Sequence, residues 1–294
     1  MLKGLYAALI TPLKDDESID FDAYRELIRR MKAGGMNGVF LTGSTSEFPL
    51  LSHAEREELI RVAVEEAAGE IDTIAHCGAS SMQESIELAQ FAERAGVTAI
   101  TAVPPRYYKF SPAEIKNYYK KLCESVSCDV LAYDIPALTG IELMEERFDG
   151  LTEPENFVGF KATTANMYLQ ERFLRLNPGK IVLHGFDESM LSAVMIGASG
   201  GIGGTYALLP RFFAKLFKCA IEGDYETAKY LQHRVNPVLD GMIPPGHTKA
   251  AKYLLMKSGI GNGKPRTPFL ELTDEEKASL DKVYELILEL DKEV

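Results

Sequence analysis

The sequence predicts an α/β protein built as a closed (β/α)8 TIM barrel with a C-terminal helical appendage. Short apolar runs alternate with amphipathic stretches along residues 1–223, which is the pattern of parallel strands joined by helices. Eight such units in about 220 residues fit a closed barrel better than an open doubly wound sheet. The open sheet is the alternative, because periodicity alone does not show that the first and last strands pair.

The eight apolar runs are the predicted strands, and each is expected to be followed by a helix. The strands are expected at residues 5–10, 38–41, 73–76, 98–102, 129–133, 156–161, 180–184 and 200–203. Clear helical patterns occupy residues 21–32, 52–68, 82–95, 111–125, 167–176 and 187–196. Asp20 is placed to cap the first helix, and Ser52 with Glu55 forms a capping box at the start of the second.

The strand pattern stops after Gly223. Helices are expected at residues 224–240, 247–257 and 274–290, with a Gly/Pro-rich connector at 259–268. We therefore divide the chain into a barrel catalytic domain, residues 1–223, and a C-terminal helical region, residues 224–294.

Composition excludes several classes of partner. The 294 residues carry a net charge of −11, and the pI is about 5.1. Without a basic stripe, neither nucleic acid nor an anionic membrane is an expected partner. No apolar segment approaches the roughly 18 residues of a membrane span, and no signal peptide is expected. The four cysteines form no C-x-x-C pair and are typical of reduced thiols, so a cytoplasmic location is expected.

Lys161 is the most informative residue, because it ends the apolar run that begins at Phe157. Lysine is rarely buried without a partner or a function. In a barrel, reactive groups lie at the C-terminal ends of strands, so Lys161 and Tyr133 should face one another from adjacent strands. Burial lowers the pKa of a lysine and frees its amine to attack a carbonyl, and a phenol beside it can transfer a proton. The alternative is that Lys161 extends from the strand end into water.

The other lysines are expected to have simpler roles. Lys180 begins its strand and should lie at the opposite end of the barrel, in a structural or solvent contact. Most of the remaining lysines lie on predicted helices or loops, where we expect them to be solvated.

Gly43-Ser44-Thr45-Ser46-Glu47 follows the second strand and is either a simple turn or an anion site. Its hydroxyl and N–H groups could form a concavity for a carboxylate. His184 ends a strand but has no second ligand nearby, so no metal site is expected. The glycine-rich segment 259–264 is not a phosphate loop, because Pro265 stands where that motif needs Ser or Thr.

Five motifs together resemble the N-acetylneuraminate lyase and dihydrodipicolinate synthase superfamily of class I pyruvate-dependent aldolases. They are Gly43-Ser-Thr-Ser-Glu47, Tyr107-Tyr108, Tyr133-Asp-Ile-Pro-Ala-Leu-Thr-Gly140, Gly159-Phe-Lys161 and Gly200-Gly-Ile-Gly203. The resemblance covers nearly the whole chain. It implies a barrel with a C-terminal helical region, assembled as a homotetramer of two tight dimers.

The resemblance also implies roles for individual residues. Lys161 matches the lysine that forms a Schiff base with the substrate, and Tyr133 matches the tyrosine that transfers protons. Ser44 and Thr45 match the pair that holds the pyruvate carboxylate, and Tyr107 matches a tyrosine that completes the neighbouring subunit's site. The remaining substrate-binding residues are expected to be Thr163, Gly185, Asp187, Glu188, Gly203 and Gly204. The protonated imine polarises the substrate, so neither a metal nor an organic cofactor is expected.

The resemblance points to the sialic acid lyases within the superfamily. Leu138 stands where the synthases carry an arginine that grips a second carboxylate, and Asp187-Glu188 matches a pair that binds sugar hydroxyls. The expected reaction is cleavage of a 2-keto-3-deoxy sugar acid. The first expected substrate is N-acetylneuraminate, which would give pyruvate and N-acetylmannosamine. The alternatives are a sister enzyme, such as a 2-keto-3-deoxygluconate aldolase or a dihydrodipicolinate synthase-like enzyme, or a catalytically silent sugar-acid binding protein.

Three positions depart from the family pattern. Ser46 replaces a glycine of the carboxylate loop, Gly204 replaces a serine that touches the sugar, and Asp134 replaces a neutral polar residue. They affect the expected sugar acid and leave the aldol chemistry unchanged.

Overall fold

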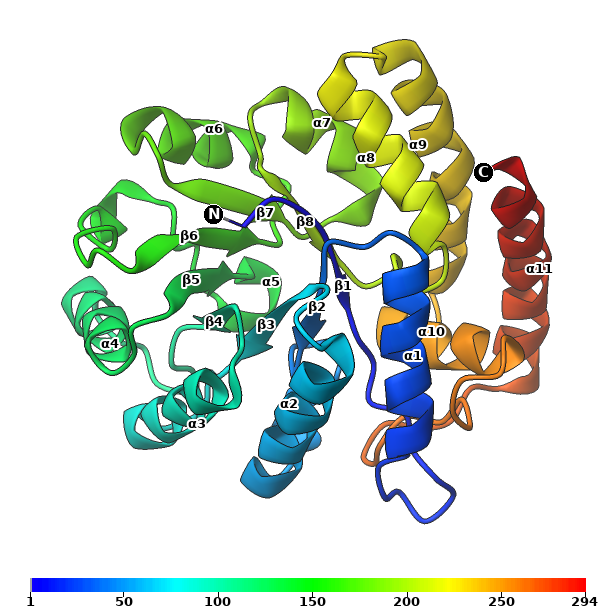
Figure 1. The fold of residues 1–294 in the computed structure, drawn as a ribbon, viewed down its shortest axis with the longest axis horizontal. Helices are drawn as coiled ribbons and strands as arrows, with labels where there is room; N and C mark the ends of the chain where they lie inside the picture. Colours follow the sequence, from blue (N-terminus) through cyan, green and yellow to red (C-terminus); the bar gives the residue numbers. More distant parts are fainter. Residues whose placement is uncertain (1) are drawn as a thin grey trace.

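The computed structural model describes residues 2–294 and contains a closed barrel of eight parallel strands in chain order (Figure 1). The strands are β1 (Gly4–Ala8), β2 (Gly38–Leu41), β3 (Asp72–His76), β4 (Ala99–Ala102), β5 (Asp129–Asp134), β6 (Phe157–Ala162), β7 (Ile181–His184) and β8 (Gly200–Gly203). Strand β1 pairs with both β2 and β8, which closes the sheet. The predicted barrel is confirmed, and the open sheet is wrong.

Helices surround the strands (Figure 1). They are α1 (Phe21–Ala33), α2 (His53–Ala67), α3 (Met82–Ala95), α4 (Pro112–Glu124), α6 (Met167–Leu176), α7 (Met190–Met195) and α8 (Pro210–Glu222). The capping box at the start of α2 is confirmed, since Glu55 N–H donates to Ser52 Oγ and Ser52 N–H donates to Glu55 Oε2.

Two predicted units differ in the structure. Strand β5 is followed only by the four-residue helix α5 (Pro136–Thr139) and a short 3-10 turn at Glu146–Phe148. The helix predicted at 187–196 is split into a 3-10 turn, Asp187–Ser189, and α7. Both departures lie directly after strands at the C-terminal mouth of the barrel, where loops carry the site.

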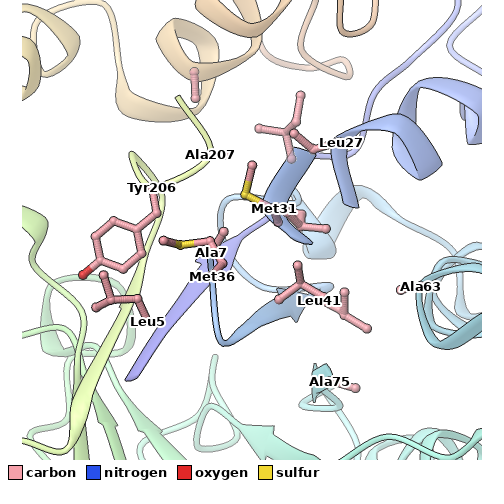
Figure 2. Close-up of a cluster of buried hydrophobic side chains, with 14 of the residues drawn as sticks. Leu5, Ala7, Leu27, Met31, Met36, Leu41, Ala63, Ala75, Tyr206 and Ala207 are labelled. Atoms are coloured by element: carbon pink, nitrogen blue, oxygen red, sulfur yellow. The ribbon is translucent and has the colours of Figure 1, made fainter. Parts of the chain in front are cut away.

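The buried apolar residues form two layers, because successive residues of a strand point to opposite faces. One layer fills the barrel interior and includes Tyr6, Phe40, Leu131, Tyr133 and Leu183. The other lies between the strands and the surrounding helices. Figure 2 shows part of this outer layer, a cluster that includes Leu5 and Ala7 of β1, Leu41 of β2, and Leu27 and Met31 of α1.

An irregularity in the pairing of β5 and β6 sets which face Lys161 occupies. Val130 pairs with Phe157, but Leu131 pairs with Gly159, so β6 carries one extra residue at this point. The shifted register places Tyr133 opposite Lys161. Gly159 is required beside the bulge, because a Cβ there would lie 1.9 Å from the Ile181 carbonyl oxygen of β7.

Three further helices follow α8 and lie along one side of the barrel (Figure 1). They are α9 (Tyr225–Met242), α10 (His247–Lys257) and α11 (Asp274–Leu290). Their buried residues belong to the same core as the outer barrel layer. The division into two domains at residue 223 stays a prediction. Within residues 2–294, no helix combines the length and apolarity that crossing a membrane requires.

Candidate active site

Lys161 is buried at the end of β6, with 4% of its surface exposed. Its Nζ lies 3.8 Å from the centre of the Phe40 ring and 3.9 Å from the centre of the Tyr133 ring. The amine therefore points into the barrel between two aromatic rings, and the alternative in which it extends into water is wrong.

Burial sets the protonation of this amine. It lowers the pKa of Lys161, while the nearby Tyr133 and Asp187 oppose the change by favouring the charged form. A lowered pKa increases the fraction of neutral amine near pH 7. Lys161 thus has the position and the chemistry of a nucleophile toward a carbonyl.

Tyr133 is the penultimate residue of β5, lies opposite Lys161 and is buried. Its hydroxyl oxygen lies 3.4 Å from Ser44 Oγ. Burial alone would raise the pKa of Tyr133. The charge of Lys161 and the hydrogen bond with the Ser44 hydroxyl lower this pKa by more than burial raises it, so the net shift is downward. A phenol with a lowered pKa between an amine and a hydroxyl is suited to transferring protons at this site.

The loop after β2 places two hydroxyl residues at the mouth of the barrel. The N–H groups of Ser46 and Phe48 donate to the Gly43 carbonyl, and the Glu47 N–H donates to the Ser44 carbonyl. Within residues 2–294, no hydrogen bond engages the N–H groups of Ser44 and Thr45. These N–H groups and the adjoining hydroxyls form the kind of concavity that binds a carboxylate.

Two residues in left-handed backbone conformations bracket this loop. Thr42 has φ 49° and Glu47 has φ 59°, a region that side chains other than glycine seldom adopt. Thr42 Oγ1 donates to the His76 carbonyl at 2.8 Å, and a ring nitrogen of His76 lies 3.0 Å from the Thr42 carbonyl. The first bracket is thereby fixed to the neighbouring strand β3.

The C-terminal region holds Glu47, at the other end of the loop, through Lys252 of α10 and Arg266. Glu47 is 3% exposed and forms an ion pair with Lys252, which is 1% exposed, and Glu47 Oε1 also accepts the Arg266 N–H at 2.8 Å. Lys252 is an exception to the expectation that most lysines on helices are solvated. Sequence reasoning missed it, although Ala250, Ala251, Leu254 and Leu255 around it mark a buried segment of α10.

Ser46, a departure from the family pattern, has a structural contact in this chain. Its Oγ donates to the Leu9 carbonyl at 2.6 Å, and its own carbonyl accepts the Thr11 hydroxyl at 2.9 Å. The side chain thus ties the loop to the chain that follows β1 and does not point at Lys161.

Lys161 opens into a cavity of about 400 Å³. The predicted site residues that line it are Ser44, Thr45, Tyr133, Lys161, Thr163, Gly185, Asp187, Glu188 and Gly204. The structure therefore brings together most of the expected set. His247, which the sequence did not single out, also lines the cavity.

Gly185 and Gly203 contribute space. A Cβ at Gly185 would lie 2.1 Å from Thr163 Oγ1, and a Cβ at Gly203 would lie 2.0 Å from Asp187 Oδ1. Each position must be glycine for the neighbouring polar group to sit where it does. Gly203 stands behind Asp187 in this arrangement, which differs from the substrate contact expected of it.

Asp187 is buried and Glu188 is exposed. Asp187 Oδ2 accepts the Thr205 N–H at 2.8 Å, whereas Oδ1 is buried and has no hydrogen-bond partner among the described residues. Burial raises the pKa of Asp187 to about 7, against the lowering effect of the Thr205 hydrogen bond. Asp187 lines the cavity, so its carboxyl group is an acceptor for a substrate hydroxyl.

Tyr107 does not lie in this cavity. Its side chain is 93% exposed, and its backbone has φ 85°. The ring packs edge-on against Tyr108, with ring centres 5.1 Å apart. The single chain therefore leaves Tyr107 outside the site, facing solvent.

Other polar residues at the strand ends serve the fold. The ring nitrogens of buried His184 lie 3.0 Å from Gln170 Oε1 and 2.9 Å from Ser189 Oγ. Lys180 donates to the Phe157 carbonyl, the structural contact expected at the opposite end of the barrel. Among the described residues, no group of three or more His, Cys, Asp or Glu side chains is arranged to hold a metal ion.

Known proteins match the chain along nearly its whole length. A model of the dihydrodipicolinate synthetase family matches residues 1–286. N-acetylneuraminate lyase of Clostridium perfringens (strain SM101 / Type A) is 37% identical over 287 residues, covering 96% of this chain and 100% of that protein.

Solved structures share the architecture. CdNal from Clostridium difficile, in complex with mannosamine, has a TM-score of 0.93 at 34% identity and covers 97% of this chain and 99% of its own. A catalytic lysine mutant of the Ruminococcus gnavus sialic acid aldolase has a TM-score of 0.94 at 27% identity, covering 99% and 97% respectively. These matches confirm the resemblance found in the motifs, and the chain belongs to the dihydrodipicolinate synthetase family.

Proposed function

We propose that this protein is a carbon–carbon lyase, a class I aldolase that cleaves N-acetylneuraminate to pyruvate and N-acetylmannosamine. The observation that carries the proposal is the buried amine of Lys161 between Phe40 and Tyr133, opening into the cavity. The names of the Clostridium perfringens and Clostridium difficile relatives support this substrate. The catalytic lysine named in the Ruminococcus gnavus aldolase supports a lysine as the reactive group.

The reaction begins when the neutral amine of Lys161 attacks the keto carbon. Tyr133 gives its phenol proton to the oxygen that leaves as water, which forms a protonated imine and leaves Tyr133 as a phenolate. Ser44 and Thr45 hold the substrate carboxylate in the loop after β2. The C–C bond then breaks, its electron pair moves into the imine to give an enamine, and the hydroxyl proton at the breaking bond passes to Tyr133. Tyr133 returns the proton to the enamine carbon, and water releases pyruvate from Lys161. No metal or organic cofactor takes part in these steps.

The far side of the cavity favours a polyhydroxy substrate. Asp187 and Glu188 accept hydrogen bonds and would repel a second carboxylate. Leu138 lines the cavity and offers no cation to pair with one, and a buried unpaired anion is costly. A sister aldolase, a synthase acting on aspartate semialdehyde and a silent sugar-acid binding protein are the competing functions.

Borohydride trapping tests the chemistry. With pyruvate and borohydride, peptide mass spectrometry should find the reduced pyruvyl adduct on Lys161, while the peptide containing Lys180 serves as an internal control. Lys161→Met should abolish the adduct and all pyruvate release. An unmodified Lys161, or an adduct on another lysine, would contradict the mechanism and favour a binding protein.

A lactate-dehydrogenase-coupled assay tests the substrate. N-acetylneuraminate should release pyruvate, and aspartate semialdehyde should not be condensed with pyruvate at a comparable rate. If the two results are reversed, the chain is a synthase and the substrate assignment is wrong.

We further propose a homotetramer in which Tyr107 completes a neighbour's site. Its 93% exposure and left-handed backbone suit a residue that contacts another subunit. Subunits carrying Tyr107→Phe and subunits carrying Lys161→Met should each be impaired alone. Mixed and reassembled, they should regain activity, because a Lys161 from one then meets a Tyr107 from the other. Full activity in a monomer by sedimentation and assay would contradict the proposal.

A cytoplasmic location stays a prediction that rests on the unpaired cysteines. Fractionation of the source cells would test it.

A further inference from the structure

We infer that His247, contributed by the C-terminal helix α10, is a substrate-binding residue that contacts the polyhydroxy tail of the sugar acid. The inference rests on the proposed function and extends it to a residue outside the barrel. Its basis is the position of the imidazole in the cavity, the absence of a side chain at Gly204, and the hydrogen bonds that link the imidazole through Thr205 to Asp187.

His247 is the first residue of α10 and lines the same cavity as Lys161. Its Nε2 lies 3.3 Å from Thr205 Oγ1, and the Thr205 N–H donates to Asp187 Oδ2 at 2.8 Å. Thr205 therefore joins the imidazole to the carboxyl that faces the tail of the substrate. Asp187 and His247 form a polar wall at the β7–β8 side of the cavity, and the fully buried Thr205 connects them.

Gly204 makes room for this ring. A Cβ at Gly204 would lie 2.4 Å from His247 Cε1 and 3.3 Å from each ring nitrogen. Contacts under 3.0 Å do not occur between real Cβ atoms and their neighbours, so a serine at 204 and the imidazole cannot both occupy these positions. The hydroxyl that the family pattern expects at 204 is absent, and the imidazole occupies the volume beside it.

The chemistry of the ring suits a hydroxyl. A neutral imidazole has one donor nitrogen and one acceptor nitrogen. Thr205 takes up Nε2, and no hydrogen bond within residues 2–294 engages Nδ1. Burial lowers the pKa of His247, so the ring is neutral near pH 7. A neutral ring in the cavity that Asp187 and Glu188 also line offers no charge to a carboxylate, but it can pair with a hydroxyl, which both donates and accepts.

The test is the condensation direction, with pyruvate saturating and the acceptor aldehyde varied. His247→Ala should raise the KM for N-acetylmannosamine about three- to tenfold, the effect of one neutral hydrogen bond. The KM for glyceraldehyde, which is too short to reach the β7–β8 wall, should change less, and the KM for pyruvate should stay at its original value. His233→Ala, on the exposed face of α9, is the matched control and should change none of these constants.

A second pair of variants separates substrate binding from folding. Gly204→Ser alone should raise the KM for N-acetylmannosamine, because the new Cβ displaces His247. Gly204→Ser combined with His247→Ala should recover most of this loss, since the serine hydroxyl then reaches the vacated space. If His247→Ala leaves the KM for N-acetylmannosamine unchanged, or raises the KM for pyruvate equally, His247 is a structural residue and the inference is wrong.

Failure of the proposed function gives a different result. If the unmodified protein forms the pyruvate adduct on Lys161 but condenses no sugar aldehyde, the substrate assignment fails. If it condenses N-acetylmannosamine and His247→Ala has no effect, only the role of His247 fails.

Discussion

Replacing Lys252 with methionine tests whether the C-terminal helices hold the carboxylate-binding loop in place. Lys252 and Glu47 are 1% and 3% exposed and form an ion pair. Methionine keeps most of the apolar stem but removes the charge, which leaves Glu47 with the hydrogen bond from the Arg266 N–H. Removing one partner of a buried ion pair costs about 3–5 kcal/mol, because the other charge stays buried without compensation.

This loss should be visible in both stability and function. At roughly 2 °C or more per kcal/mol, Lys252→Met should lower the melting temperature by about 6 °C or more, measured by thermal melting with circular dichroism. Glu47 also holds the left-handed backbone two residues after Thr45, so the KM for pyruvate should rise. The trapping reaction at Lys161 should still occur at high pyruvate, since the lysine itself is untouched.

Two further variants make the result decisive. Lys257→Met lies in the same helix but removes a partly exposed pair, in which Lys257 and Asp281 lie 3.0 Å apart, so melting temperature and KM should stay close to the original values. Glu47→Gln combined with Lys252→Met should recover much of the lost stability, because no charge is then left unpaired. If Lys252→Met melts like the unmodified protein, or if the double variant loses the sum of both single losses, the ion pair does not hold the loop.

Three other predictions concern the site and its surroundings. Tyr133→Phe should still form the imine with pyruvate but slow turnover by roughly 10²–10⁴-fold, the contribution of a general acid–base group; trapping and steady-state rates measure the two effects, and near-original turnover would contradict the proton-transfer role. Burial raises the pKa of Asp134 to about 7, above an unfolded value near 4, so the native state binds the extra proton and stability falls as pH rises between these values. Asp134→Asn should therefore melt higher than the unmodified protein at pH 8, with the gap closing toward pH 5; a gap that is independent of pH would refute this. Asp187→Asn and Glu188→Gln should each raise the KM for N-acetylneuraminate far more than the KM for pyruvate in condensation, and equal changes in both would place these residues outside the tail site.

Local signals explain how much of the fold could be predicted. Asp20, Ser52 and Ser111 each accept a backbone N–H in the first turn of a helix, so the starts of α1, α2 and α4 follow from short-range chemistry. The units after β5 and β7 were mispredicted. At both places the chain forms short helices and turns around the C-terminal mouth of the barrel. The spacing of apolar residues is a weak predictor of such short elements.

Some residues of the site could be predicted from the sequence and others could not, for physical reasons. Lys161 and Tyr133 stand out because an ionisable group that ends an apolar strand must be paired or used. Lys252 and His247 gave no comparable signal, since their partners Glu47 and Gly204 are distant in the sequence and meet them only after α10 packs against the barrel. The burial of Lys252 is therefore an exception that sequence patterns do not mark.

The sequence by itself determined the alternation of strands and helices, the caps, the lysine at a strand end and the family. Only the tertiary structure decided which way that lysine points. If the pairing continued without a bulge from Val130 and Phe157, Tyr133 would lie opposite Phe160. Lys161 would then face the outer helices. The extra residue before Gly159 shifts the register by one, and because side chains alternate along a strand, it turns the amine into the barrel. Pairing between strands sets that shift, and Gly159 permits it, but the spacing of the apolar residues in β6 does not show it.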